Sequence, residues 1–331
     1  MHKRIGAAAV LGFIGLGGTA MAEPPQDPHG ILTVQIENDA ISTRRGTTDE
    51  YYTSGLRLGY TTGTDAVPGF LGALGRVVWG NGVQRVSFDI SQSIFTPHNT
   101  RLNPPDPRDR PYAGWLRGDV QLLTDKDTSR SVLGVSLGVI GSGALGQEVQ
   151  NGFHSVIGDP STKGWGYQLP NEPAVQLLAG RTYRYRLGQV GPVETDVLPA
   201  LEVGVGTVRD YVQAGAVFRL GQGLDSDYGV PRIQPGFSGG DAYTPTRPFA
   251  WYVFAGGNGQ AIARDEFLDG SAFQSSRSVG HRAFVGEAEL GAAVMLAGVR
   301  VTYLQVFQSP EFGHQRAGVF NFGSLSASVR F

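Results

Sequence analysis

The chain has 331 residues, among them 49 glycines and no cysteine, and it carries 27 basic against 29 acidic side chains. Because cysteine is absent, a disulfide framework, thiol catalysis and a thiolate zinc site are excluded. The lack of a basic excess argues against nucleic acid as a partner.

The N-terminus has the features of a secretory signal peptide over residues 1–22. A basic start is followed by an apolar run over Ile5–Leu16 and by small residues at Ala20-Met21-Ala22. The run is too short for a membrane-spanning helix, and no later segment offers about 18 consecutive apolar residues. We therefore expect an exported protein whose mature part, residues 23–331, meets a membrane only as strands.

Twelve segments of the mature chain alternate apolar and polar residues with period two, and each is near the ~9–11 residues that a tilted transmembrane strand needs. They are Ile31–Asp39, Tyr52–Thr62, Val83–Phe95, Tyr112–Thr124, Ser131–Ile140, Ala174–Tyr185, Glu194–Gly206, Tyr211–Leu220, Phe249–Asn258, Val279–Leu296, Val299–Gln308 and Phe320–Phe331. The last of them ends in an aromatic residue, which is typical of bacterial outer-membrane barrels. The sequence thus predicts an all-β fold, a transmembrane antiparallel up-and-down β-barrel of about twelve strands in the bacterial outer membrane.

A barrel of this type begins and ends in the periplasm, so the connections that follow odd-numbered strands are extracellular. These are Ala40–Tyr51, Thr96–Pro111, Gly141–Pro173, Gly259–Ser278 and Ser309–Val319. The longest contains Leu145–Ile157, which lacks strand alternation and is predicted to form a short helix. Gly221–Pro248 fits badly, because it is long yet falls on the periplasmic side. Either the strand count is wrong or this turn is elaborated.

Three polar segments are expected to converge on the extracellular rim: Glu37-Asn38-Asp39, Tyr51–Gly55 and Gln147–His154. On a helix Gln150 and His154 are four residues apart and share a face. The histidine would be a general base that activates water for ester cleavage. The alternatives are a turn at the Asn-Asp pair and a surface or packing histidine. No GxSxG motif supports a serine nucleophile.

Hard oxygen ligands also gather in and near these segments, with carboxylates at Glu37, Asp39, Glu148 and Asp159 and amides at Asn38 and Gln150. Oxygen-rich sites without cysteine select calcium or magnesium. A calcium ion held there would polarise an ester carbonyl and stabilise the oxyanion. The spacing matches no EF-hand loop.

The second outer loop carries arginines whose planar guanidinium groups suit phosphate, notably Arg101 and Arg110, followed by Tyr112. The outer leaflet of such a membrane is rich in phosphorylated lipid, so these three residues are candidates for substrate binding. A solvated loop with an Asp109–Arg110 pair is the equally open alternative.

Six ordered motifs together resemble the LpxR-type lipid A 3′-O-deacylase family over nearly the whole mature chain. They are Glu37-Asn38-Asp39, Tyr51-Tyr52-Thr53-Ser54-Gly55, Gln92 through Phe95-Thr96-Pro97, Asp109 through Gly114, Gly146 through Asn151 with His154, and Gly164-Trp165 with Gln168 and Glu172. The resemblance implies an outer-membrane barrel that removes the 3′-acyloxyacyl group of lipid A in a calcium-dependent reaction.

The resemblance also assigns roles, with His154 as the base that activates water. Asn38, Asp39, Thr53 and Gln150 would complete the catalytic site. The chain departs from the family pattern at two points. Arg101 is the nearest basic residue where a lysine is expected in the second loop, and Asp159 is the nearest acid after the histidine.

We therefore expect a monomeric, membrane-embedded esterase that uses Ca²⁺ and acts from the extracellular rim on lipid A, the anchor of lipopolysaccharide. Two alternative functions are also consistent with the sequence. An outer-membrane phospholipase would use the same base and metal on a glycerophospholipid, whereas a small porin or structural barrel would use neither.

Overall fold

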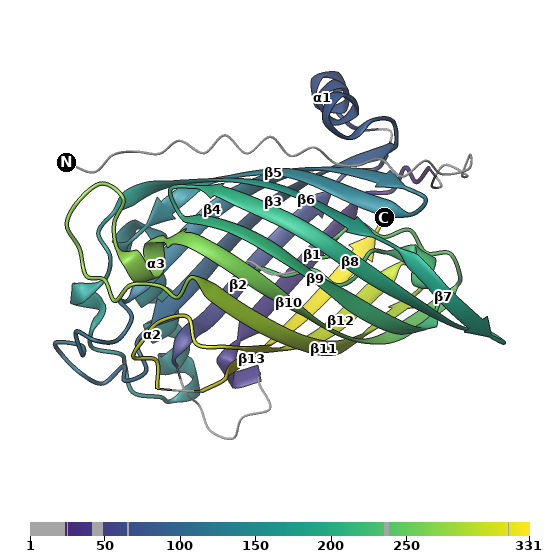
Figure 1. Cartoon of the computed structure of the whole chain (residues 1–331). Helices are drawn as coiled ribbons and strands as arrows, with labels where there is room; N and C mark the ends of the chain where they lie inside the picture. Colours follow the sequence, from purple (N-terminus) through teal and green to yellow (C-terminus); the bar gives the residue numbers. More distant parts are fainter. Residues whose placement is uncertain (1–23, 25, 42–48, 65, 235–237, 317) are drawn as a thin grey trace.

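The computed structural model describes residues 24, 26–41, 49–64, 66–234, 238–316 and 318–331, and it forms a closed antiparallel β-barrel (Figure 1). The strands are β1 (Ile31–Asn38), β2 (Tyr51–Thr61), β3 (Val83–Thr96), β4 (Ala113–Lys126), β5 (Ser129–Ile140), β6 (Glu172–Tyr183), β7 (Tyr185–Val190), β8 (Val193–Gly206), β9 (Arg209–Gln222), β10 (Phe249–Asp265), β11 (Phe284–Leu296), β12 (Val299–Gln308) and β13 (Phe320–Arg330). The predicted signal peptide lies outside the described residues.

The barrel closes where the first and last strands pair, from Ile31 opposite Arg330 to Asn38 opposite Gly323. β6 and β7 are interrupted at Arg184 but both pair with β8, so they form one wall strand. The barrel therefore has the twelve strands that the alternation predicted.

Two predicted strand boundaries were wrong. β10 continues past Asn258 to Asp265, because its alternation of buried and exposed residues persists to that point. β11 begins only at Phe284 instead of Val279, because the preceding residues turn back over the rim, where His281 is held by Asp269 at 2.7 Å.

Side chains alternate between the lumen and the outer wall along each strand. In β1, Thr33, Gln35 and Glu37 are buried, whereas Leu32 and Val34 are exposed. The buried set is polar and the exposed set is apolar, which is the reverse of a soluble protein and suits a wall that faces lipid.

The helices lie at the two ends of the barrel. α2 (Gly146–Ile157) confirms the helix predicted in the longest outer loop, and α3 (Glu266–Asp269) lies at the same end. α1 (Gly69–Trp79), which the sequence analysis missed, lies outside the wall at the end where the C-terminal strand finishes (Figure 1). No helix of the described residues is long and apolar enough to cross a bilayer.

The long connection between β9 and β10 folds back into the lumen. The strand count is therefore right, and this long periplasmic turn is an elaborated one. It begins with the short helix η4 (Leu224–Ser226), and the backbone amides of Ile233 and Gln234 then donate to lumenal Glu37 at 2.9 and 3.0 Å. Asp241 pairs with Arg57 at 2.6 Å. We call the described residues 227–234 and 238–243 the plug.

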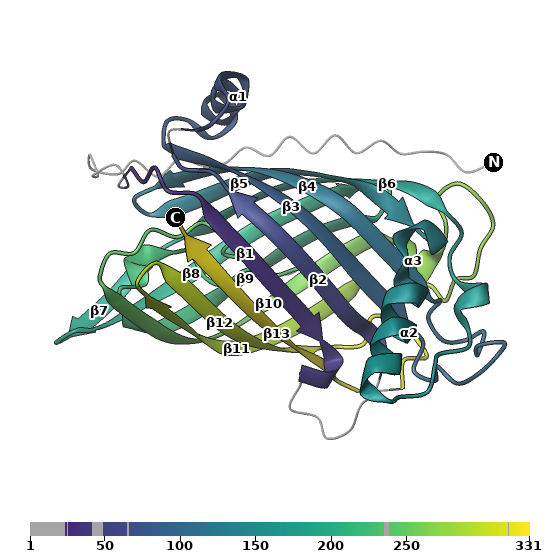
Figure 2. The same cartoon turned by 180° about the vertical axis from the view of Figure 1, so that it is seen from behind.

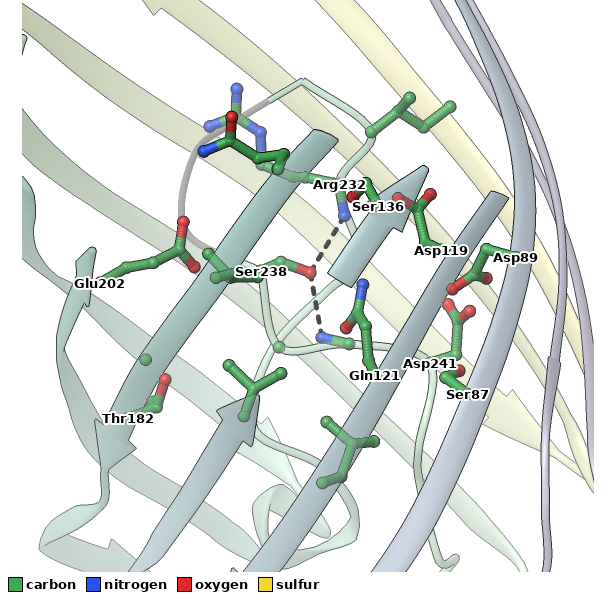
Figure 3. A pocket seen from close by; sticks show the side chains of 18 of the residues that line it. Ser87, Asp89, Asp119, Gln121, Ser136, Thr182, Glu202, Arg232, Ser238 and Asp241 are labelled. Atoms are coloured by element: carbon green, nitrogen blue, oxygen red, sulfur yellow. Dashed lines mark hydrogen bonds between the residues drawn. The ribbon is translucent and has the colours of Figure 1, made fainter. Parts of the chain in front are cut away.

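A cavity of about 140 Å³ remains between the plug and the wall. Figure 3 shows Ser238 of the plug accepting hydrogen bonds from the backbone amides of Arg232 and Gly240, at 3.3 and 3.1 Å. Acidic side chains from the wall, among them Asp89 and Glu202, surround this segment. The lumen is thus occupied by protein, unlike the water-filled channel of a porin.

At the periplasmic end Asp27 fastens the start of the chain to the wall. Its carboxylate pairs with Arg85 of β3 at 2.9 Å and with Arg330 of β13 at 2.8 Å. Burial opposes ionisation of Asp27, but hydrogen bonds from Arg330 and His29 outweigh it and hold the pKa of the carboxyl well below its usual range. Asp27 therefore links β3 to β13 across the seam between β1 and β13.

Candidate active site

A cavity of about 110 Å³ lies at the extracellular rim, between the outer ends of β1 to β3 and α2. Figure 2 shows α2 beside the ends of these strands, outside the barrel wall. Its polar lining comprises Asn38, Asp39, Asp49, Thr53, Ser54, Gln150, His154 and Asp159. The structure thus brings together the three segments that the sequence predicted to converge.

The cavity opens on the lipid-facing side of the wall and not into the lumen. In β1 the outward row continues from Leu32 and Val34 through Ile36 to Asn38, both of which line the cavity. The intervening Glu37 points inward to the plug. The rest of the lining is apolar, and three of its residues, Leu56, Phe153 and Ile157, are half-exposed. Polar and apolar groups therefore meet at the level where a lipid headgroup joins its chains.

Thr53 owes its position to a β-bulge. The register of β2 against β3 shifts between Tyr52 and Ser54, so Thr53 is an extra residue in its strand. A bulge re-aims a side chain, and bulges are frequent beside functional sites. The Thr53 hydroxyl is buried and hydrogen-bonded to the Thr96 hydroxyl at 2.7 Å. Just before it, Tyr51 has a φ of 61°, a strained value for a bulky residue.

Close packing fixes α2 against the wall. A Cβ atom on Gly146 would lie 2.7 Å from the Trp165 ring, and one on Gly114 would lie 3.1 Å from Ala144. Glycine is needed at both positions because the backbones approach so closely. Trp165 also donates to the Gln150 side-chain oxygen at 2.9 Å. This packing explains the glycines of two of the motifs.

His154 is oriented by partners at both ring nitrogens. Nδ1 lies 2.9 Å from the Pro160 carbonyl oxygen, and Nε2 lies 2.7 Å from Asp49 Oδ2. A carbonyl oxygen only accepts, so Nδ1 carries a proton and Nε2 is the nitrogen that can gain or lose one at the cavity. The short distance between His154 Nε2 and Asp49 Oδ2 is that of a hydrogen bond, which forms when one of these two atoms carries a proton.

Two carboxyl groups of the cavity, those of Asp39 and Asp49, resist ionisation. Burial raises the pKa of Asp49, and the Asp159 charge adds to this effect, whereas His154 and the Gln150 amide oppose it. Burial also raises the pKa of Asp39 well above its usual range. The charges of Asp49 and Glu50 add to that shift, while the Glu50 backbone amide, which donates to Asp39 at 2.9 Å, opposes it. The site therefore favours protons or cations.

The family model described as outer membrane protein LpxR matches residues 7–331 of the chain. The chain belongs to the LpxR family. Among solved structures, LpxR from Salmonella typhimurium is 22% identical, with a TM-score of 0.76 over 91% of this chain and 100% of that chain. The protein is thus an outer membrane protein with the barrel fold of LpxR.

Other outer-membrane barrels are less similar. The β-domain of the Bordetella autotransporter BrkA is 9% identical, with a TM-score of 0.42 over 92% of this chain and 98% of that chain. The translocator domain of NalP from Neisseria meningitidis is 12% identical, with a TM-score of 0.41 over 93% and 90%. A search of curated proteins gives no match.

The structure places the remaining predicted site residues of this LpxR-family chain elsewhere. Arg101 is exposed on the second outer loop and does not line the cavity. Arg110 is buried, paired with Glu311 at 3.0 Å. Tyr112 is also buried, and it packs on Trp165 with ring centroids 4.9 Å apart. It thus supports the tryptophan that contacts α2. Glu148 is exposed and is not part of the lining.

Asp49 is the residue that sequence reasoning missed. It directly precedes Glu50 and the Tyr51–Gly55 motif. An acid at the end of the first outer loop was a usable signal, because that loop was predicted to lie at the same rim as His154. The motif alone did not reveal it, since the contact joins segments that are far apart in the chain.

The donor chemistry of the cavity fits the calcium ion that the LpxR family implies. Asp39 is buried and Asp49 is half-buried. Their pKa values are raised chiefly by burial and in part by neighbouring negative charge, and a divalent cation would relieve that repulsion. Amide and hydroxyl oxygens from Asn38, Gln150 and Thr53 are close by. Within the described ranges no three His, Asp or Glu side chains already converge as a ready-made ligand group.

Proposed function

We propose that this protein is a lipid A 3′-O-deacylase of the outer membrane, an ester hydrolase that releases the 3′-acyloxyacyl group. The observation that carries the proposal is the position of the cavity, whose polar residues open on the lipid-facing side of the wall. A lipid in the outer leaflet reaches such a site by lateral diffusion, with its acyl chains along Leu56 and Ile157. Membership of the LpxR family and the likeness to Salmonella LpxR support the same substrate.

The chain's own residues account for the proton transfers. His154 Nε2 takes a proton from water, and the resulting hydroxide adds to the ester carbonyl carbon. When the tetrahedral intermediate collapses, the carbon–oxygen bond to the sugar breaks and Nε2 returns the proton to the 3′-oxygen. The products are the acyloxy fatty acid, whose own secondary ester stays intact, and the sugar hydroxyl. The Pro160 carbonyl holds the required tautomer throughout.

Asp49 stabilises the charge that forms on His154 in this mechanism. Its carboxylate lies in line with Nε2, so it turns aside to admit water and then receives a hydrogen bond from the protonated ring. Asp49 is partly exposed, with 24% of its side-chain surface accessible, which leaves room for that movement.

The Gln150 amide is placed to bind the oxyanion. Its oxygen is occupied by Trp165, which orients Nε2 of the amide. Nε2 is buried and faces Asp49, whose ionised form it stabilises. Asp39, with oxygens from Asn38 and Thr53, would hold Ca²⁺, which when bound would supply Lewis-acid polarisation of the ester carbonyl.

The test is acyl release from purified barrel given Ca²⁺ and lipid A, followed by mass spectrometry of the products. We expect loss of the 3′-acyl group by wild type and none by His154→Ala. A parallel reaction with phosphatidylethanolamine separates a deacylase from a phospholipase. Wild type and His154→Ala releasing equally little from both lipids would contradict hydrolysis altogether.

A porin function is disfavoured by the plug. Glu37, Arg57 and Arg130 of the wall all bind it, the last through the carbonyls of Gly239 and Ala242 at 2.7 and 2.9 Å. Planar bilayers containing the protein should show no steady conductance.

A further inference from the structure

α1 is an amphipathic helix with two faces of opposite environment. Gly72, Gly75 and Trp79, spaced at i, i+3 and i+7, are buried against the barrel. The other face carries Phe70, Leu74, Val77 and Val78, of which Phe70 and Val77 are 74% and 84% exposed. An exposed apolar face of this kind usually contacts another molecule, so the molecule that covers it has to be identified.

The buried face docks on the outer wall, not on the lumen. The Gln84 side chain on β3 donates to the Gly72 carbonyl at 3.2 Å, and a Cβ on Gly75 would lie 3.1 Å from Leu122 of β4. Leu122 is 3% exposed. Because Gln84 and Leu122 belong to the outward rows of their strands, α1 covers a part of the wall that would otherwise face lipid.

The exposed face continues the lipid-facing wall. Further along the same outward row of β3, Phe88 and Ile90 are 44% and 65% exposed, with no protein over them. The barrel is an outer membrane protein, so these residues contact lipid. α1 lies outside the wall at the periplasmic end (Figure 1).

Basic and aromatic groups frame the helix where a membrane interface would lie. Lys126 caps its C-terminus by donating to the Trp79 carbonyl at 2.8 Å. The Arg181 guanidinium lies 4.8 Å from the centre of the Trp79 ring, and Arg76 is exposed on the flank of the helix. Tryptophan and basic side chains are enriched at membrane interfaces, where the cations meet lipid phosphates.

We propose that α1 is an interfacial anchor embedded in the periplasmic leaflet, with Phe70, Leu74, Val77 and Val78 among phospholipid acyl chains and its cations at the headgroups. The helix lies in the plane of the interface and binds glycerophospholipid, at the end of the barrel opposite the cavity. It sets the depth at which the barrel sits in the bilayer. This role is independent of the hydrolytic activity.

Because the chain contains no cysteine, single cysteines can be labelled specifically. The full-length barrel is placed in nanodiscs of phosphatidylethanolamine and phosphatidylglycerol, with a nitroxide at Phe70→Cys or Val77→Cys. Ile90→Cys is the lipid control and Arg108→Cys, on an exposed outer loop, is the water control. Collision with dissolved oxygen, which concentrates in lipid, is compared with collision with a water-soluble nickel complex.

The proposal expects labels at 70 and 77 to match position 90, with an oxygen-to-nickel ratio several-fold above that at position 108. A ratio like that at 108 would overturn it by placing the helix in water. Protection from both reagents would also overturn it, because a second copy or a protein partner would then cover the face. Folding of each variant is checked by its heat-dependent mobility on gels.

Discussion

Replacing Asp49 with asparagine tests the assignment that the sequence did not foresee. The change keeps the side-chain size and removes the charge that lies 2.7 Å from His154 Nε2. A hydrogen bond to a charged group contributes about 1.5–3 kcal/mol. Solvent screens a side chain that is 24% exposed, so we take the lower part of this range, about 1.5–2 kcal/mol. The expected fall in kcat is then about 10- to 30-fold.

The pH profile separates an electrostatic role of Asp49 from a structural one. Burial raises the pKa of Asp49, and its carboxylate must be ionised to stabilise the charged ring, so its protonation contributes to the acidic limb of the wild-type rate profile. The acidic limb of the rate profile should therefore move to lower pH in Asp49→Asn. Rates are measured as acyl release from lipid A at saturating Ca²⁺. Asp106→Asn, which alters an exposed loop pair, serves as the control.

A rate equal to or above wild type, with an unmoved acidic limb, would refute the reasoning. It would mean that Asp49 only blocks Nε2 in the resting enzyme. His154→Ala gives the scale for comparison, because loss of a general base costs about 100- to 10,000-fold.

Three further predictions concern packing, metal binding and the seam. Gly146→Ala forces α2 off the wall and should lower activity at least tenfold (about 1.4 kcal/mol), whereas Gly152→Ala on the same helix, where a Cβ meets nothing, should leave the rate unchanged. Protons compete with Ca²⁺ for Asp39, because the pKa of this carboxyl group is raised. The Ca²⁺ concentration for half-maximal activity should therefore rise as the pH falls. Asp39→Asn should need a higher Ca²⁺ concentration, and that concentration should depend less on pH. Asp27→Asn leaves the buried Arg85 without its carboxylate and should destabilise the barrel by roughly 3 kcal/mol in urea unfolding. Because the folded pKa of Asp27 is lowered, this contribution is present above pH ~3.9 and is lost as the pH falls through the folded value, so wild type and variant should converge in strong acid.

The wall was predictable because a lipid-facing barrel imposes a period of two on each strand. Ile31–Asn38 shows the pattern directly, with polar residues at every second position. The plug was not predictable in the same way. Its residues follow no period, and Asp241 is held by Arg57, a partner 184 residues away.

The site was predictable in outline, since the strand directions alone put Asn38, Thr53 and His154 at one rim. Individual roles were harder to infer. Arg110 was predicted to bind phosphate, but it is buried and paired with Glu311. The α1 helix was not predicted, because its glycines, which allow close docking on the wall, also lower the helix propensity of the sequence.

The plug has a consequence for how the barrel is held closed. Its residues bind β1 through Glu37 and β12 through Arg300, which pairs with Asp227 at 3.2 Å. Strands from both halves of the chain therefore bind the same segment, and a barrel that closed without it would leave Arg300 without its carboxylate partner and Arg57 without its contact to Asp241. The plug therefore links β1 and β12, which lie on either side of β13, and so holds the two sides of the β1–β13 seam together from within the lumen.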